Sequence, residues 1–180
     1  MSIETNLSDK QNICLVGFMF SGKTTIGSLL SKSLKWHFID TDLEIEKENL
    51  LRIKDIFEYF SESLFRQIET RKIEEICKNE KQIISIGGGA FCSAKNIKII
   101  KDHCIVIYLK PSFDEIKKRI TKKGISKRPL FQDFEKAEKL FQERQKYYSQ
   151  AHFIIDTNDK IPKDVKKEIK NILKKNVRLK

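Results

Sequence analysis

Residues 17–24 read GFMFSGKT, and this loop lies between an apolar run at 13–16 and a helical pattern of apolar residues that begins at Ile26. This order is typical of a phosphate-binding P-loop, because glycines let consecutive backbone N–H groups curl around an anion and the following helix points its positive end at it. Lys23 is placed to reach the β- and γ-phosphates of a nucleotide, and the Thr24 hydroxyl to bind Mg²⁺. The loop therefore predicts an α/β protein that binds a nucleotide.

The 180 residues fit one compact domain spanning 1–180, since no Pro/Gly/Ser-rich linker, repeat or low-complexity segment divides them. Residues 1–11 are polar and are expected to be flexible. Short, nearly unbroken apolar runs, typical of a parallel sheet covered on both faces, predict five strands: Ile13–Val16, His37–Ile39, Ile83–Ile86, Cys104–Leu109 and Phe153–Ile155. Helical patterns fill the intervals, so the expected fold class is α/β with helices on both faces of the sheet.

The four cysteines have no metal-ligand spacing, which favours buried thiols in a reducing cytoplasm. No run of 18 apolar residues occurs, and the first residues do not resemble a signal peptide, so no membrane partner is expected.

The net charge of +11 makes nucleic acid a candidate partner. Most of the excess lies in residues 160–180, which hold nine basic and two acidic residues. Apolar residues repeat there at helical spacing and no aromatic residue interleaves with the lysines. A solvated lysine face on one helix is the preferred interpretation, and no nucleic acid partner is predicted.

Residues that follow the predicted strands should meet at one edge of the sheet. Asp40 and Asp42 follow the second strand, where two carboxylates can serve Mg²⁺-bound water and a substrate hydroxyl; the alternative is that Asp42 caps the next helix. Gly87, Gly88 and Gly89 follow the third strand and leave bare backbone for a small ligand to approach, or simply form a turn.

Together these features resemble the shikimate kinase family. The motifs that carry the resemblance extend over most of the chain: GFMFSGKTTIG at 17–27, DTD at 40–42, FRQIE at 65–69, GGG at 87–89, RPL at 128–130, and Arg144 four residues before Tyr148. The resemblance implies a three-layer P-loop kinase fold like that of nucleoside monophosphate kinases, with sheet order 2-3-1-4-5 and a mobile lid at about 122–133. It also implies transfer of the ATP γ-phosphoryl group to the 3-hydroxyl of shikimate, in the pathway to chorismate and the aromatic amino acids.

The resemblance also assigns residues by position. ATP would be bound by the loop and by three residues beyond it: Gly17, Phe18, Met19, Phe20, Ser21, Gly22, Lys23, Thr24, Thr25, Arg119, Arg128 and Pro162. Shikimate would be bound by Asp42, Arg66, Gly87, Gly88, Gly89 and Arg144. Lys23, Asp42 and Arg128 would be catalytic, while Thr24 and, through water, Asp40 would hold Mg²⁺.

The two arginines also have a physical argument of their own. A guanidinium fork binds a planar carboxylate through two hydrogen bonds, which lysine cannot do, and shikimate carries such a carboxylate. The alternative is ordinary helix chemistry, with Glu62 and Arg66 as a surface i,i+4 ion pair and Arg144 on a solvated helix.

Two positions depart from the family pattern. Phe20 stands in the loop where glycine is usual, and because phenylalanine tolerates positive φ poorly, we expect a backbone conformation there that ordinary residues adopt. Ser61 also replaces a frequent glycine and is expected to cap the helix that carries Arg66.

Three functional hypotheses follow: a shikimate kinase, a related kinase for gluconate or a nucleoside monophosphate, and a nucleotide-gated binding protein that engages RNA through its basic end. The first is preferred, as a cytoplasmic monomer. The histidines, His37, His103 and His152, each precede a strand at the sheet edge away from the expected site, and no catalytic role is predicted for them.

Overall fold

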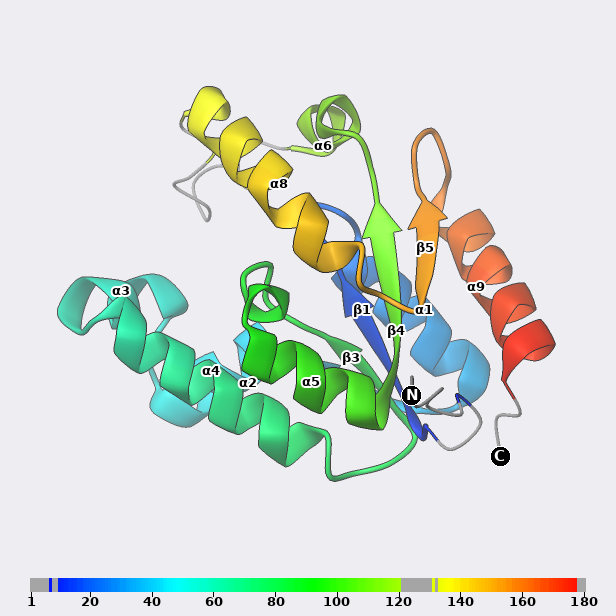
Figure 1. Ribbon diagram of the computed structural model, residues 1–180, viewed down its shortest axis with the longest axis horizontal. Helices are drawn as coiled ribbons and strands as arrows, with labels where there is room; N and C mark the ends of the chain where they lie inside the picture. Colours follow the sequence, from blue (N-terminus) through cyan, green and yellow to red (C-terminus); the bar gives the residue numbers. More distant parts are fainter. Residues whose placement is uncertain (1–6, 8–9, 121–130, 132, 178–180) are drawn as a thin grey trace, which may run out of the picture.

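The computed structural model describes residues 7, 10–120, 131 and 133–177. Its centre is a five-stranded parallel sheet in the order β2-β3-β1-β4-β5 (Figure 1). The strands are β1 (Asn12–Val16), β2 (His37–Asp40), β3 (Gln82–Ser85), β4 (Cys104–Lys110) and β5 (Phe153–Asp156). All five predicted strands and the predicted order are confirmed, with ends that differ by one residue.

Alternation along the central strands gives each face of the sheet its own apolar core. In β1, Ile13 and Leu15 belong to one buried cluster, whereas Cys14 and Val16 belong to the other. Successive side chains of a strand point to opposite faces, so a strand covered on both sides must be apolar at every position. This is the reason that the unbroken apolar runs predicted the strands correctly.

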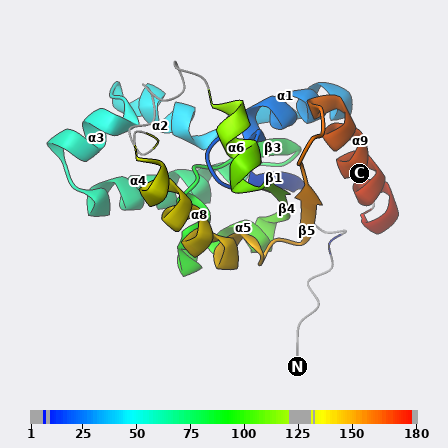
Figure 2. The same cartoon turned by 90° about the horizontal axis from the view of Figure 1, so that it is seen from above.

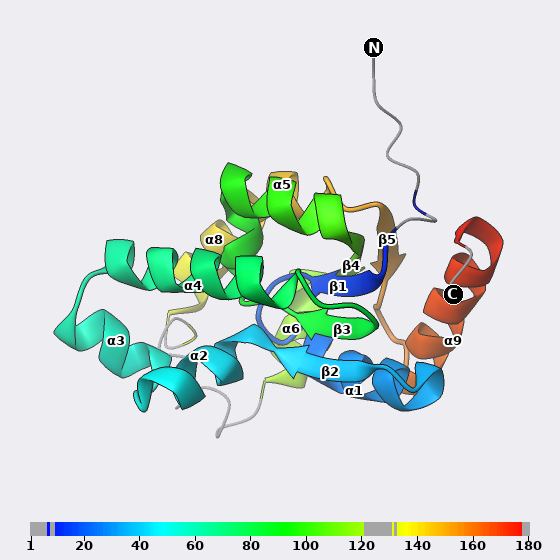
Figure 3. The same cartoon turned by 90° about the horizontal axis from the view of Figure 1, so that it is seen from below.

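Helices cover both faces, as Figures 2 and 3 show. On one face lie α1 (Lys23–Leu34) and α9 (Pro162–Asn176). The opposite face carries α4 (Glu62–Ile76), α5 (Ala94–His103) and α8 (Phe134–Tyr148). The short helix α6 (Phe113–Arg119) follows β4, and the 3₁₀ turn η2 (Ala90–Cys92) follows the glycine triplet. The predicted three-layer α/β arrangement is confirmed.

A smaller helical group lies beside the sheet, next to the first half of α4 (Figure 3). It consists of α2 (Thr41–Asn49) and α3 (Ile53–Tyr59), whose buried Ile45 and Ile56 pack with Phe65 of α4. Ser61 caps α4 as predicted, since its hydroxyl accepts a hydrogen bond of 3.1 Å from the Leu64 N–H. This group holds the start of α2 and the first turns of α4 against one another.

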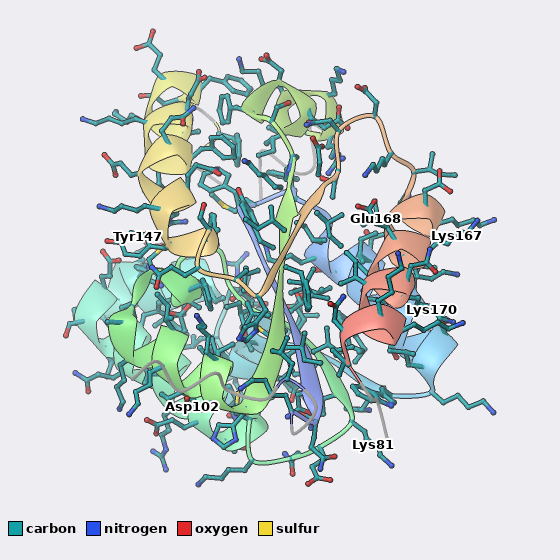
Figure 4. The ribbon with its side chains drawn as sticks, turned by 45° about the vertical axis from the view of Figure 1, so that its right-hand side comes forward. Lys81, Asp102, Tyr147, Lys167, Glu168 and Lys170 are labelled. Atoms are coloured by element: carbon teal, nitrogen blue, oxygen red, sulfur yellow. The ribbon has the colours of Figure 1, made fainter. Side chains whose placement is uncertain are left out.

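The terminal helix α9 presents its apolar residues to the sheet and its lysines outward. Val165 and Ile169 are buried, while Lys167 is exposed (Figure 4). Lys170 reaches back to α1, where its ammonium donates to the Ser33 hydroxyl at 2.7 Å. The lysine face is therefore part of the packing of α9 as well as a solvated surface. Within the described ranges, no helix is long and apolar enough to cross a membrane.

Two predicted flexible segments fall largely outside the described residues. Of the segment 1–11, Lys10 is buried, and its ammonium donates to the carbonyls of Lys101 and Asp102, so the chain is anchored by residue 10. Of the predicted lid at 122–133, only Phe131 and Asp133 are described. Phe131 is buried, and Asp133 accepts a hydrogen bond from the Lys136 N–H as the N-cap of α8, so the described end of this segment is packed.

Candidate active site

The phosphate-binding loop leaves the carboxyl end of β1 and enters α1 at Lys23. Gly17 and Gly22 have φ of 144° and 99°, which side chains rarely adopt, and a Cβ on Gly17 would lie 2.7 Å from the Leu109 carbonyl oxygen. The Lys23 ammonium donates to the carbonyls of Gly17 and Phe18 at 2.8 and 3.0 Å, across the loop. The loop therefore has the curled backbone and the cation that an oligophosphate requires.

Phe20 does not follow the sequence-based expectation. Its φ is +62°, in the left-handed region, whereas a conformation open to ordinary residues was predicted. The prediction was wrong because it considered the backbone preference alone. The Phe20 ring lies 5.0 Å, edge to face, from the ring of Phe131, which is a tertiary contact that sequence spacing does not reveal.

Asp40 and Thr24 form a pair of oxygen donors beside the loop. Asp40 ends β2, and its Oδ2 accepts a hydrogen bond of 2.8 Å from the Thr24 hydroxyl at the start of α1. Among the described residues, no three His, Cys, Asp or Glu side chains gather to hold a metal ion. Mg²⁺ usually takes one or two protein oxygens and completes its shell with phosphates and water, so this hydroxyl–carboxylate pair has suitable donor chemistry.

Asp42 lies in the first turn of α2 and faces the glycine triplet. A Cβ on Gly87 would lie 2.6 Å from Asp42 Oδ1, so this carboxylate rests against bare backbone. The alternative reading of Asp42 as the helix N-cap is wrong, because α2 begins at Thr41 and its N-cap is Asp40. The Thr41 hydroxyl accepts a hydrogen bond from the Gly87 N–H at 3.2 Å, which joins the ends of β2 and β3.

Arg66, on α4, lies against the last glycine of the triplet. A Cβ on Gly89 would be 2.9 Å from both terminal nitrogens of its guanidinium. The ion pair with Glu62 that was considered as the alternative does form, at 3.1 Å. It is joined by a second carboxylate, Glu69, at 2.8 Å, so the guanidinium is oriented at the triplet and is not a plain surface pair.

Glu69 is a site residue that sequence reasoning left without a role. Its side chain is 2% exposed, and burial raises the pKa of its carboxyl, an effect that Asp42 strengthens and that Arg66 and Arg144 oppose. A signal was available: Glu69 lies four residues after Phe65 and four before Ile73, on the buried stripe of α4. A charged residue on such a stripe needs a buried partner, which here is Arg66.

Arg144 reaches the triplet from α8, on the other side of the site. Its guanidinium carbon lies 5.8 Å from the ring centre of Phe18, and a Cβ on Gly88 would be 3.5 Å from its Nη1. The Tyr148 hydroxyl donates to the Gly88 carbonyl and ties α8 to the triplet. Two arginines from helices that are distant in the sequence thus flank the same three glycines.

A pocket of about 530 Å³ connects these parts. Its lining joins the end of the phosphate loop, both aspartates and two glycines of the triplet to Arg119 and residues beyond β5. The lining residues are Met19, Phe20, Ser21, Gly22, Lys23, Thr24, Thr25, Ile26, Asp40, Asp42, Ser85, Ile86, Gly87, Gly88, Arg119, Thr157, Lys160, Pro162 and Val165. This volume lies within the range of small-molecule sites. Arg66, Gly89 and Arg144 do not line it and instead adjoin it at the glycine triplet.

Arg119 is held at this pocket by α6. Its guanidinium donates to the Ser21 carbonyl at 3.2 Å and to the Thr157 carbonyl, and Glu115 accepts from its Nε at 3.0 Å. Pro162, the first residue of α9, lines the same pocket. Arg128, the remaining predicted site residue, lies outside the described residues.

The histidine with the most perturbed surroundings is structural. His152 Nδ1 accepts a hydrogen bond of 2.9 Å from the Val106 N–H, and burial, reinforced by Lys101 and Lys10, lowers the pKa of the ring to about 4. It precedes β5, at the sheet edge away from the pocket.

A family model described as shikimate kinase matches residues 19–174 of the chain. The chain belongs to the shikimate kinase family. A shikimate kinase of Persephonella marina is 41% identical over 160 residues, which is 88% of this chain and 96% of that protein. The solved structure of a shikimate kinase from Acinetobacter baumannii in complex with shikimate has a TM-score of 0.87 and 33% identity, and covers 94% of this chain and 96% of that one. That of the Aquifex aeolicus enzyme has a TM-score of 0.79 and 35% identity over 92% of this chain and 97% of that one.

Family membership decides among the three functional hypotheses. The reaction is the ATP-dependent phosphorylation of shikimate, and the enzyme is a transferase of the P-loop kinase class. Neither a kinase for gluconate or nucleoside monophosphates nor a nucleotide-gated RNA-binding protein is supported.

Proposed function

We propose that this enzyme transfers the phosphoryl group to the 3-hydroxyl of shikimate with Lys23, Asp42 and Arg128 as its catalytic residues. The observation that carries the proposal is the position of Asp42: its carboxylate rests on Gly87 and lines the same pocket as Lys23 and Thr24. A base for the acceptor hydroxyl and a cradle for the donor phosphates therefore share one cavity. Phosphoryl transfer leaves the protein little covalent chemistry, so positioning and charge neutralisation supply most of the acceleration.

The nucleotide occupies the pocket, which residues 19–25 of the loop line, and its phosphates lie on the loop backbone from residue 17 to residue 25. Lys23 exchanges its hydrogen bonds to the Gly17 and Phe18 carbonyls for phosphate oxygens, which are stronger acceptors because they are charged. Arg119 and Pro162 border the adenine. Arg128 brings a further cation to the transferring group, as the resemblance implies for this position.

Thr24 and Asp40 hold Mg²⁺, Asp40 through water. The ion neutralises charge on the transferring phosphates when bound. The 2.8 Å contact between the two side chains supports the assignment, because it already places a neutral and an anionic oxygen side by side at the start of α1.

Shikimate binds at the glycine triplet with its carboxylate between Arg66 and Arg144. Both guanidinium groups lie beside glycines, at Gly89 and Gly88, where a larger residue would displace or crowd them. Asp42 accepts hydrogen bonds from the ring hydroxyls and takes the proton of the attacking one. Glu69 keeps Arg66 pointed at the acid group.

The remaining expectations are proposals of the same kind. The enzyme acts as a cytoplasmic monomer in the pathway to chorismate, and its partners are ATP and shikimate, with no nucleic acid or membrane. Two lysines of the basic C-terminal segment support this view, since Lys170 on α9 contacts Ser33 and Lys160, which precedes α9, contacts Glu168.

The test is an assay of ADP release with Mg-ATP and a panel of shikimate, quinate, gluconate and nucleoside monophosphates. We expect kcat/KM for shikimate to exceed that for the others by about 100-fold or more. Lys23→Ala, which removes the loop's cation, should abolish turnover and excludes a contaminating kinase. Equal turnover across the panel, or none with shikimate, would overturn the proposal.

A further inference from the structure

Phe20 is unusual among the residues with positive φ. In the part of the chain that the structure describes, the other non-glycine residues in this region are Lys35, Leu50, Lys81 and Asp159. Lys35 and Leu50 are helix C-caps, where the left-handed conformation is common. Phe20 alone among these five lies inside the loop that is to bind phosphate.

A left-handed residue in such a loop has a defined effect. It turns successive backbone N–H groups toward the same side, which forms the concave nest that binds an anion. Gly22, with φ of 99°, does this without cost, whereas a side chain at Phe20 crowds its own backbone. The binding-competent loop therefore includes a conformation that phenylalanine resists by itself.

A specific contact offsets this resistance. The half-buried ring of Phe20 meets the ring of Phe131 edge to face, with centroids 5.0 Å apart and planes at 76°. Phe131 is 1% exposed, and it also packs edge to face on Phe18 at 6.1 Å and on Phe134 at 6.2 Å. Phe131 is thus fixed by neighbours on the loop and on α8, and can hold the Phe20 ring in one place.

We propose that Phe20 is a positioning residue for the nucleotide and that Phe131 holds its backbone in the left-handed conformation. In this chain a pair of aromatic side chains does what a glycine does by conformational freedom. The inference rests on the proposed binding of nucleotide phosphates by the loop and adds a determinant of affinity to it. The packing of residue 131 then sets how tightly the loop binds ADP and ATP.

If Phe131 holds Phe20 in the left-handed conformation, Phe20→Gly should suppress the effect of a substitution at Phe131, whereas a role of Phe131 in core packing alone predicts no such suppression. In Phe131→Leu the strain at residue 20 is no longer offset, so we expect the Kd for ADP, measured by calorimetry, to rise about tenfold. Phe20→Gly removes the strain and the need for the clamp, so the double variant F20G/F131L should bind ADP within about threefold of F20G alone. KM for ATP should follow the same order, while KM for shikimate stays within about twofold.

Phe141→Leu is the matched control. Phe141 belongs to the same aromatic cluster and packs on Phe18 at 5.4 Å and on Phe113 at 5.5 Å, but no ring contact joins it to Phe20. Phe141→Leu should lower the melting temperature of the protein as Phe131→Leu does. Adding Phe20→Gly to the Phe141→Leu variant should not change the ADP affinity of that variant.

Phe20→Ala provides a second, independent comparison, because it leaves the buried Phe131 unchanged. Alanine loses the ring and keeps the penalty for positive φ, so F20A should bind ADP at least threefold more weakly than F20G. Equal affinity of F20A and F20G, or a loss in F131L that F20G fails to restore, would overturn the inference while leaving the nucleotide site intact. Failure of the wild-type protein to bind ADP at all would instead overturn the site assignment and this inference together.

Discussion

Arg66 and Glu69, one turn apart on α4, form an ion pair in which the guanidinium Nη1 donates to Glu69 Oε2 at 2.8 Å. The arginine side chain is 34% exposed and the glutamate side chain 2% exposed. The buried partner fixes the direction of the exposed one. The same guanidinium also contacts Glu62 at 3.1 Å, but that glutamate is 67% exposed. We therefore infer that the buried Glu69 orients the Arg66 guanidinium more strongly than the exposed Glu62 does.

We expect Glu69→Gln to weaken shikimate binding by about 1–2 kcal/mol, or about 5- to 30-fold in KM, because the amide loses the charge-assisted hydrogen bond that orients Arg66. KM for ATP should change by less than about twofold. Glu62→Gln is the matched control, and steady-state kinetics of both variants decide. Equal effects of the two substitutions would contradict the anchoring role of Glu69.

Arg66→Lys and Arg144→Lys keep the positive charge but lose the planar fork. Each should weaken shikimate binding by about 1–3 kcal/mol and leave ADP binding nearly unchanged, as calorimetry can measure. Arg71→Lys, an exposed position on the same helix as Arg66, provides a control that should bind like wild type. If both site variants bind shikimate as tightly as this control does, the arginines have no role in substrate recognition.

Asp40 and Asp42 are two residues apart and should respond differently to the same change. Asp40→Asn should raise the Mg²⁺ concentration required for half-maximal activity several-fold, because the carboxylate beside Thr24 is lost. Asp42→Asn should lower kcat by about 100-fold or more, because the acceptor hydroxyl loses its base. Glu44→Gln, in the same first turn of α2, controls for the charge at the helix start. Identical Mg²⁺ titrations of Asp40→Asn and wild type would refute this division.

His152 predicts a pH dependence of stability. Burial lowers the pKa of its ring to about 4, from an ordinary value near 6.5, so the unfolded chain takes up the proton first as the pH falls. This contribution is complete above about pH 6.5, decreases as the pH falls from there, and is lost once the pH has fallen through about 4. It should amount to about 1–2 kcal/mol, because solvent still screens the half-buried ring. Urea unfolding of wild type and His152→Asn at pH 7.5 and pH 5 measures it. A difference between the two proteins that stays constant between these pH values would exclude the effect.

Local pattern was sufficient to predict the five strands and the α/β class, while the strand order came from the family resemblance. The apolar runs of β1 and β4 are buried on both faces, so burial is encoded at every position and period-two alternation is not needed to find them. The cap at Ser61 was also predicted correctly, since capping involves only the first turn of a helix. The phosphate loop was recognisable because its glycines, lysine and threonine act within eight consecutive residues.

The sequence by itself therefore determined the parallel sheet, the phosphate loop and, through the order of its motifs, the family. Only the tertiary structure decided which side chains act together. Glu69 became the anchor of Arg66 because α4 buries that face, and Phe20 adopts positive φ beside Phe131, a residue 111 positions away in the chain. Interactions within a few residues depend on local geometry, which a sequence states directly. Contacts between distant residues depend on how helices and strands pack. That packing is decided only in the folded protein, where side chains from the whole chain must fit together in one close-packed core.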